Sequence, residues 1–217
     1  MISPFSSPLP ESHGALALPL AELRFVQTTL SGYTYLQSQE ITMLKFIGIL
    51  AVVAICVILI LAAMKPSTFI VERSVSINAP PEKIAPLIND FHSWDIWSPW
   101  AKLDPAMKTV YSGAPSGVGA IYEWDGNSKV GKGRMQVTSI QPAKTSIKLD
   151  FLKPFEGHNT ADFVLEPEGS ATRVTWVMYG PLNFIPGKLM SVFITMDKMI
   201  GDDFQRGLAN LKAAAEK

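Results

Sequence analysis

Apolar and polar residues alternate with a period of two through most of the chain after residue 108. The clearest segment is Ile147-Lys-Leu149-Asp-Phe151, which is typical of a strand with one buried and one solvated face. An earlier β-rich segment, Phe69–Ile77, predicts one more strand. Turns rich in Gly, Pro, Ser and Asn separate the strands predicted in the alternating region, which are Thr109–Ser112, Ala120–Asp125, Gly133–Ile140, Ser146–Leu152, Asn159–Glu166 and Thr172–Tyr179.

Helical spacing is found on both sides of these strands. Pro80 and Pro81 suit the first turn of a short helix, after which apolar residues recur every three or four positions up to Phe91. Three tryptophans at positions 94, 97 and 100 predict a further helical turn. The longest helix is predicted near the C-terminus, on an apolar stripe without Pro that consists of Leu189, Phe193, Met196, Ile200, Phe204, Gly207, Leu208 and Leu211.

This order of elements predicts an α+β domain over residues 68–217. About seven strands form a curved antiparallel sheet, two short helices follow the first strand, and the long helix ends the domain. A sheet with one apolar face needs a partner that buries this face, and the long helix is the candidate.

A continuous apolar run precedes the domain. The 19 residues Phe46–Met64 carry no charge, and as a helix they measure about 28 Å, close to the hydrocarbon core of a bilayer. The alternatives are a buried helix and a cleaved signal peptide, but a signal peptide has a shorter apolar region, and the best cleavage site begins with Leu61 rather than a small residue. An uncleaved transmembrane helix over residues 44–65 is predicted.

The residues before this run, 1–42, show no sustained periodicity and predict a disordered tail. Met43 directly before the run also has the form of a start residue, so a second hypothesis is that the native product begins there. Lys45 precedes the run, and Lys65 and Arg73 follow it. Because these positive charges are nearly balanced, the positive-inside rule gives only a weak indication of the orientation of the helix. We expect a single-pass protein of a bacterial plasma or inner membrane, with the domain on the extracytoplasmic side.

Composition and charge exclude several classes of function. The chain has 19 Lys+Arg and 19 Asp+Glu and no net charge, so it lacks the basic excess of nucleic-acid binding proteins. Its one cysteine, Cys56, lies in the apolar run and forms no internal disulfide. Cys and His residues lack zinc-ligand spacing, and neither a metal nor another cofactor is expected. The sequence does not predict the oligomeric state.

Three features that look like functional motifs have simpler explanations. The segment Gly126–Gly133 is similar to a phosphate-binding loop, but Gly133 stands where that loop needs Ser or Thr, and a strand rather than a helix follows. We therefore predict a hairpin turn. His92 and His158 lie at separate turns, so neither is assigned a catalytic role. The catalytic residues, if any, stay unknown.

Several segments together resemble the START/Bet v 1-like (SRPBCC) superfamily, in particular its polyketide cyclase/dehydrase-type branch. The resemblance covers residues 68–216. It implies a helix-grip fold, in which the sheet wraps around the C-terminal helix and leaves a cavity for apolar molecules. The segments that carry it are Ile77–Ile84, Asn89–Trp100, Tyr122–Trp124, Thr172–Trp176 and Met199–Lys212.

The lining of such a cavity follows from strand alternation. If Ile147, Leu149 and Phe151 face inward, every second residue of each other strand faces inward as well, because side chains alternate between the two faces of a sheet. Large aromatics and methionines dominate this set, which suits an apolar or planar ligand. The alternative is a filled core without a cavity. The pocket candidates are Tyr122, Trp124, Met135, Phe151, Asn159, Phe163, Trp176, Met178, Met196 and Met199.

Three functions are compatible with these observations. The first is a membrane-anchored binding or carrier domain for a hydrophobic small molecule, such as a lipid, a quinone or a polyketide-like compound. The second is a cyclase/dehydrase-type enzyme that acts in the same cavity. The third is a protein-interaction module without a ligand. The sequence favours the first, because no paired acid and base residues are predicted inside the domain.

Overall fold

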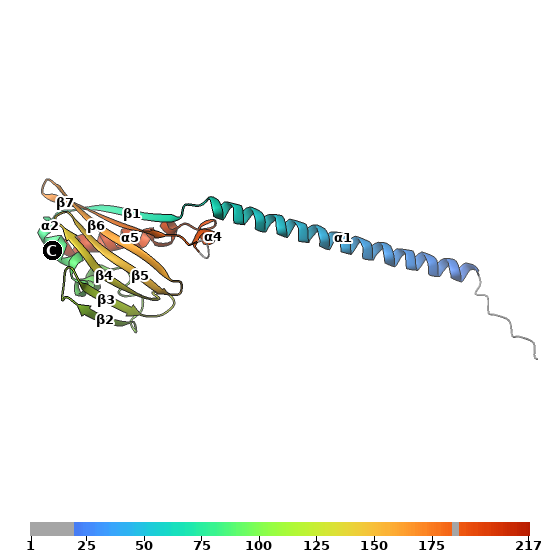
Figure 1. Cartoon of the computed structure of the whole chain (residues 1–217), viewed down its shortest axis with the longest axis horizontal. Coiled ribbons are helices and arrows are strands. Elements are labelled where there is room, and N and C mark those ends of the chain that lie inside the picture. The colour runs from blue at the N-terminus through green and yellow to red at the C-terminus, as the bar shows by residue number, and fades with distance from the viewer. Residues whose placement is uncertain (1–19, 184–186) are drawn as a thin grey trace, which may run out of the picture. The chain divides into compact units, whose positions relative to one another are not determined.

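The computed structural model describes residues 20–183 and 187–217. The chain divides into two compact units, one that ends at Cys56 and one that runs from Val57 to Lys217. The second unit contains the sheet and helices of the predicted domain (Figure 1).

The N-terminal helix is longer than predicted. Helix α1 spans Leu20–Met64, so the prediction of a disordered tail is wrong for residues 20–42, and residues 1–19 lie outside the described residues. No Pro interrupts this stretch, and a helix that has been nucleated extends at little cost per residue. Hydroxyl groups also donate to carbonyl oxygens one turn earlier, as Thr28 Oγ1 does to Arg24 O at 2.6 Å. A start at Met43 stays a hypothesis.

The segment Gln27–Met64 of α1 is long and apolar enough to cross a membrane, and only 6% of its most apolar window is buried. These properties fit a single-pass anchor or a signal sequence.

The domain is built on one antiparallel sheet of seven strands in the order β1-β7-β6-β5-β4-β3-β2. All seven predicted strands are confirmed, with small extensions at their ends. The strands are β1 (Thr68–Ile77), β2 (Lys108–Gly113), β3 (Ala120–Asp125), β4 (Lys132–Gln141), β5 (Lys144–Lys153), β6 (Gly157–Glu168) and β7 (Ala171–Pro181).

The predicted inner face of the sheet is confirmed by its burial. In register, Met135 lies opposite Leu149, Phe163 opposite Trp176 and Met178 opposite Ala161, and these side chains are buried. Strand alternation alone was sufficient to assign this face, because each strand has one apolar and one polar side.

The helices after β1 are α2 (Pro81–Asn89), the 3₁₀ turn η1 (Phe91–Ser93) and α3 (Trp94–Trp97). The predicted long C-terminal helix is interrupted. It consists of α4 (Leu189–Ser191) and α5 (Met196–Ala215), and Thr195 caps α5 by accepting a hydrogen bond from the Lys198 N–H through its hydroxyl. The cap residue is extended, which ends the apolar stripe and leaves Phe193 72% exposed.

Helix α5 packs on the inner face of the sheet mainly along β1. Phe204, Leu208 and Leu211 supply its buried side. Polar contacts fix it at both ends, because Arg73 pairs with Asp197 at 2.7 Å and the Lys212 ammonium donates to Ser76 O at 2.6 Å. The antiparallel sheet, the short helices and α5 form the predicted helix-grip fold.

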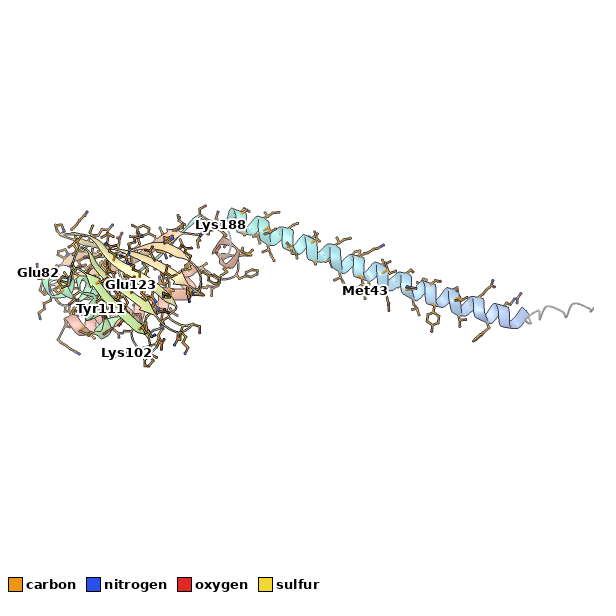
Figure 2. The ribbon with its side chains drawn as sticks, turned by 60° about the horizontal axis from the view of Figure 1, so that its bottom comes forward. Met43, Glu82, Lys102, Tyr111, Glu123 and Lys188 are labelled. Carbon is orange, nitrogen blue, oxygen red and sulfur yellow. The ribbon has the colours of Figure 1, made fainter. Side chains whose placement is uncertain are left out.

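The two ends of this domain are closed differently. Helices α2 and α4 lie at opposite ends of the sheet, as shown by Glu82 in α2 and by Lys188 directly before α4 (Figure 2). Ile84 and Ile88 of α2 are fully buried, so α2 plugs its end of the interior. Helix α4 has only three residues and none of them is buried. Among the described residues, those at the α4 end therefore leave space inside the sheet.

Candidate ligand cavity

A cavity of about 270 Å³ lies inside the domain. The inner faces of β3 to β7 form one wall, and the first turns of α5 together with α3 and the loop after it form the other. The residues that line it are Trp94, Asp95, Ser98, Trp100, Ala101, Met107, Tyr122, Trp124, Ser128, Lys129, Val130, Gly131, Met135, Leu149, Phe151, Pro154, Ala161, Trp176, Met178, Met196, Ile200 and Phe204.

Seven of the ten predicted pocket residues line this cavity. They come from β3, β4, β5, β7 and the start of α5, and are Tyr122, Trp124, Met135, Phe151, Trp176, Met178 and Met196. The chain brings them together because each occupies an inward position, either in the middle of its element or toward its α4 end.

The other three predicted pocket residues lie elsewhere. Phe163 is fully buried in the core and stacks on Trp176 with 4.9 Å between ring centroids. The amide of Asn159 is buried against Gly180, which has no side chain to occupy that space. Met199 is 45% exposed, since it lies one position beyond the buried stripe of α5.

The tryptophan-rich segment was missed as part of the site. Trp94 and Trp100 line the cavity, and Trp97 is fully buried behind them. The indole N–H of Trp94 donates to Ile88 O at 2.9 Å and that of Trp97 to Leu87 O at 2.8 Å, so α2 holds both rings inward. Their spacing of three residues was the available signal, because it places bulky rings on one side of a helical turn.

Aromatic rings form a stack at the inner wall. Trp176 lies between Phe204, at 4.1 Å and 13° between the rings, and Phe163, at 4.9 Å and 27°. Trp97 and Trp100 meet the same ring edge-on at 5.5 Å and 5.8 Å. The wall on this side is therefore rigid, whereas Met135, Met178 and Met196 supply adaptable side chains.

Few polar groups reach into the cavity. Burial, followed by the charges of Tyr111 and Asp95, raises the pKa of Tyr122 to about 12, so this hydroxyl stays protonated at neutral pH. The indole N–H of Trp124 donates to Val130 O at 3.0 Å. The charged lining residues, Asp95 and Lys129, are exposed. Within residues 20–183 and 187–217, no group of three His, Cys, Asp or Glu side chains is placed to hold a metal ion.

Loops form the outer wall of the cavity. The rejected phosphate-loop segment is a turn between β3 and β4, as predicted, and its residues 128–131 border the cavity. The buried carboxylate of Asp104 joins this turn to the loop after α3, because it accepts the N–H of Asn127 at 2.7 Å and that of Ala106 at 3.1 Å. Gly131 has a φ of 66° and lies directly against Lys153, a place that has no room for a side chain.

His92 and His158 lie outside the cavity. His92 stacks on Tyr111 at 4.1 Å and hydrogen-bonds Asp90, while His158 pairs with Asp150 at 2.8 Å. The hydrogen bond that the His158 ring donates to the Asp150 carboxylate raises the pKa of His158. Both rings therefore have roles in local surface structure.

Comparison with known proteins agrees with this geometry. The model of the family "Polyketide cyclase / dehydrase and lipid transport" matches residues 68–216. A search of curated proteins gave no match.

Solved structures align with the domain at low sequence identity. The di-domain ARO/CYC BexL from the BE-7585A biosynthetic pathway is 16% identical with a TM-score of 0.51, over 72% of this chain and 53% of that chain. Hypothetical protein jhp0584 from Helicobacter pylori is 10% identical with a TM-score of 0.51, over 68% and 88%. Protein CV1439 from Chromobacterium violaceum is 18% identical with a TM-score of 0.47, over 70% and 99%.

Proposed function

Because the chain belongs to the polyketide cyclase/dehydrase and lipid transport family, we propose that it is a membrane-anchored binding or carrier domain for a hydrophobic small molecule. The observation that carries this proposal is the cavity of about 270 Å³ with its aromatic and methionine lining. A concave, mostly apolar pocket with a few polar groups is the usual form of a small-molecule site.

The position of the cavity supports a link to the membrane. It lies at the end of the sheet where β1 begins, since Met178 of the lining pairs with Val71 near the start of that strand. Three residues separate Met64, the last residue of α1, from β1. We propose that residues 46–64 cross the bilayer and keep the cavity close to an apolar ligand that is dissolved there.

Binding is favoured over cyclase-type catalysis by the chemistry of the lining. Acid and base catalysis needs a titratable group positioned at the reacting atoms. Among the residues described, the titratable groups of the lining are Tyr122, Asp95 and Lys129. The high pKa of Tyr122 makes it a hydrogen-bond donor rather than a base, and the other two are exposed.

The test is to identify compounds that stay bound to the purified full chain in lipid nanodiscs, by extraction and mass spectrometry. We expect one apolar compound in near-stoichiometric amount. Ala161→Phe fills the cavity and should abolish its retention. Thr160→Phe changes the opposite face of the same strand and should leave the retention of the compound unchanged. Lipid held by α1 would be retained equally by both variants, so a difference between them reports on the cavity. A folded protein that retains no compound and binds no added apolar probe would contradict the proposal.

We also propose that the domain lies on the extracytoplasmic side of the membrane. A reporter enzyme that is active only outside the cytoplasm, fused after Lys217, should be active. Activity of a cytoplasmic reporter at the same position would reverse this assignment.

A further inference from the structure

The segment between β7 and α5 is apolar and yet lies at the surface. Residues 182–196 carry one charge, that of Lys188, and none of the residues 187–195 is buried. Phe193 is 72% exposed, and Met190 and Ile194 close to it in the chain are exposed as well. Apolar side chains that gather at a surface in this way mark a place where another apolar partner covers them.

The backbone of this segment is paired within the segment itself. The N–H groups of Phe193 and Ile194 both donate to Met190 O at 3.0 Å, and the Lys188 N–H donates to Asn183 O at 2.8 Å. The segment is therefore a folded turn that presents its side chains. Paired N–H groups also lower the cost of moving the turn into an apolar medium, where unpaired groups are expensive.

Two exposed phenylalanines lie at this end of the domain. The Leu182 N–H donates to Ser67 O at 2.7 Å, directly before β1, and α4 is seen beside the start of β1 (Figure 1). The turn between β5 and β6 is at the same end, since Gly157 after it pairs with Phe151 of the cavity lining. Phe155 in this turn is 56% exposed.

Lysines accompany these phenylalanines. Lys65, Lys153 and Lys188 form no ion pair with any residue that the structure describes. The acidic residue of the turn between β5 and β6, Glu156, pairs with His158. Exposed apolar side chains among free lysines are typical of surfaces that bind at the headgroup boundary of a bilayer with anionic lipids.

We propose that the α4 end of the domain docks on the bilayer that α1 crosses, with Phe193 and Phe155 inserted below the lipid headgroups. The inference rests on the membrane crossing proposed above and adds a second contact with the same membrane. A bilayer is favoured over a protein partner because three residues link α1 to β1, which keeps the effective concentration of lipid at this end high. Docking also brings the cavity, which borders this end, against the lipid phase.

The test measures the depth of a single fluorescent label in the full chain. Cys56→Ser removes the one native cysteine, and Phe193→Cys then provides the labelling site. The protein is placed, one copy per disc, in nanodiscs of phosphatidylcholine and phosphatidylglycerol, some of whose lipids carry a nitroxide near the headgroup end of an acyl chain. We expect these lipids to quench most of the emission of the label, and aqueous iodide to leave it unchanged. Phe155→Cys should give the same result.

Two further positions are the controls. Val118→Cys labels an exposed apolar position in the turn between β2 and β3, which is held to the end of α2 by the hydrogen bond from the Gly117 N–H to Asn89 O. This label should be quenched by iodide and not by the nitroxide lipids. Leu61→Cys labels the end of the proposed membrane span and should be quenched by the nitroxide lipids.

The controls separate the two ways in which the inference can fail. If the label at position 61 is quenched by lipid but the label at position 193 is quenched by iodide, the docking inference is overturned and the membrane crossing stands. Protection of position 193 from both quenchers would also overturn it, because protein and not lipid would then cover Phe193. If the nitroxide lipids quench neither position, the proposed membrane crossing fails and the docking fails with it.

Discussion

The two ends of the domain interior are built from the same strands and the same helix, yet one end is filled and the other is hollow. At the closed end, beneath α2, the residues Val137, Ile147, Val174 and Leu208 are at most 1% exposed. At the open end, beside α4, the residues Phe151, Met196 and Ile200 are only half-buried and border the cavity. The strand pattern is equally apolar at both ends, so the difference arises from what covers them.

The coverings differ in length and in anchoring. Helix α2 has nine residues, and it holds two tryptophan rings in place through its carbonyl oxygens. Helix α4 has three residues, and the chain then becomes extended at Thr195, the N-cap of α5. A sheet that wraps around one helix therefore encloses a cavity when a packed helix fills only one end of its interior.

Truncation of equivalent residues at the two ends should have the largest effect. Ile147 and Phe151 lie on the same face of β5, four residues apart. Ile147→Ala removes a fully buried side chain and should lower the free energy of unfolding by about 3–4 kcal/mol, because the packed end cannot relax into the space. Phe151→Ala removes more atoms but should cost only about 1–2 kcal/mol, since this ring is half-buried beside existing space.

Urea unfolding of the full chain in detergent micelles, followed by near-ultraviolet circular dichroism, measures both values. Wild-type protein in the same micelles is the reference. Equal costs for the two variants, or a larger cost for Phe151→Ala, would show that the open end is as tightly packed as the closed end.

Replacement of two tryptophans that differ in their hydrogen bonding should give a smaller difference in the free energy of unfolding. Trp97→Phe leaves the carbonyl oxygen of Leu87 without its donor, whereas Trp176→Phe breaks no hydrogen bond within the described residues. Trp97→Phe should therefore be the more destabilising by about 1–2 kcal/mol. The same unfolding assay, without added ligand, tests this order. A reversed order would mean that the Trp176 N–H has a partner in the free protein.

The sequence predicted the sheet better than it predicted the cavity. Strand alternation located the inner face correctly, as the buried residues Met135 and Trp176 show, because side chains alternate along each strand and one side of the strand is solvated. It could not separate Phe163, which is core, from Phe151, which borders the cavity, since both point inward. That distinction depends on which end of the sheet is covered, and this is a property of the assembled domain.

The errors on the helices have local causes. The stripe from Leu189 to Leu211 has helical spacing throughout, but the cap at Thr195 interrupts it, so Phe193 is exposed. A Thr before an Asp-containing first turn was a readable signal for a new helix start. In α1, the lack of an amphipathic pattern suggested a tail, whereas the absence of Pro from residues 20–64 permitted one continuous helix.

The smallest effect is expected on the outer surface of the open end, where the hairpin of β5 and β6 forms the wall of the cavity. His158 of β6 lies opposite Asp150 of β5, and the hydrogen bond that the His158 ring donates to this carboxylate raises the pKa of His158 above its ordinary value of 6.5. A raised pKa in the folded state means that the charged pair stabilises the domain fully below about pH 6.5, the pKa of unfolded His. The contribution is lost as the pH rises through the folded pKa of His158.

His158→Gln should therefore reduce the midpoint of urea unfolding more at pH 5.5 than at pH 8.5. The effect should be small because the ring is exposed. A larger reduction of the unfolding midpoint at pH 8.5 would show that neutral His158, rather than the ion pair, stabilises the hairpin of β5 and β6.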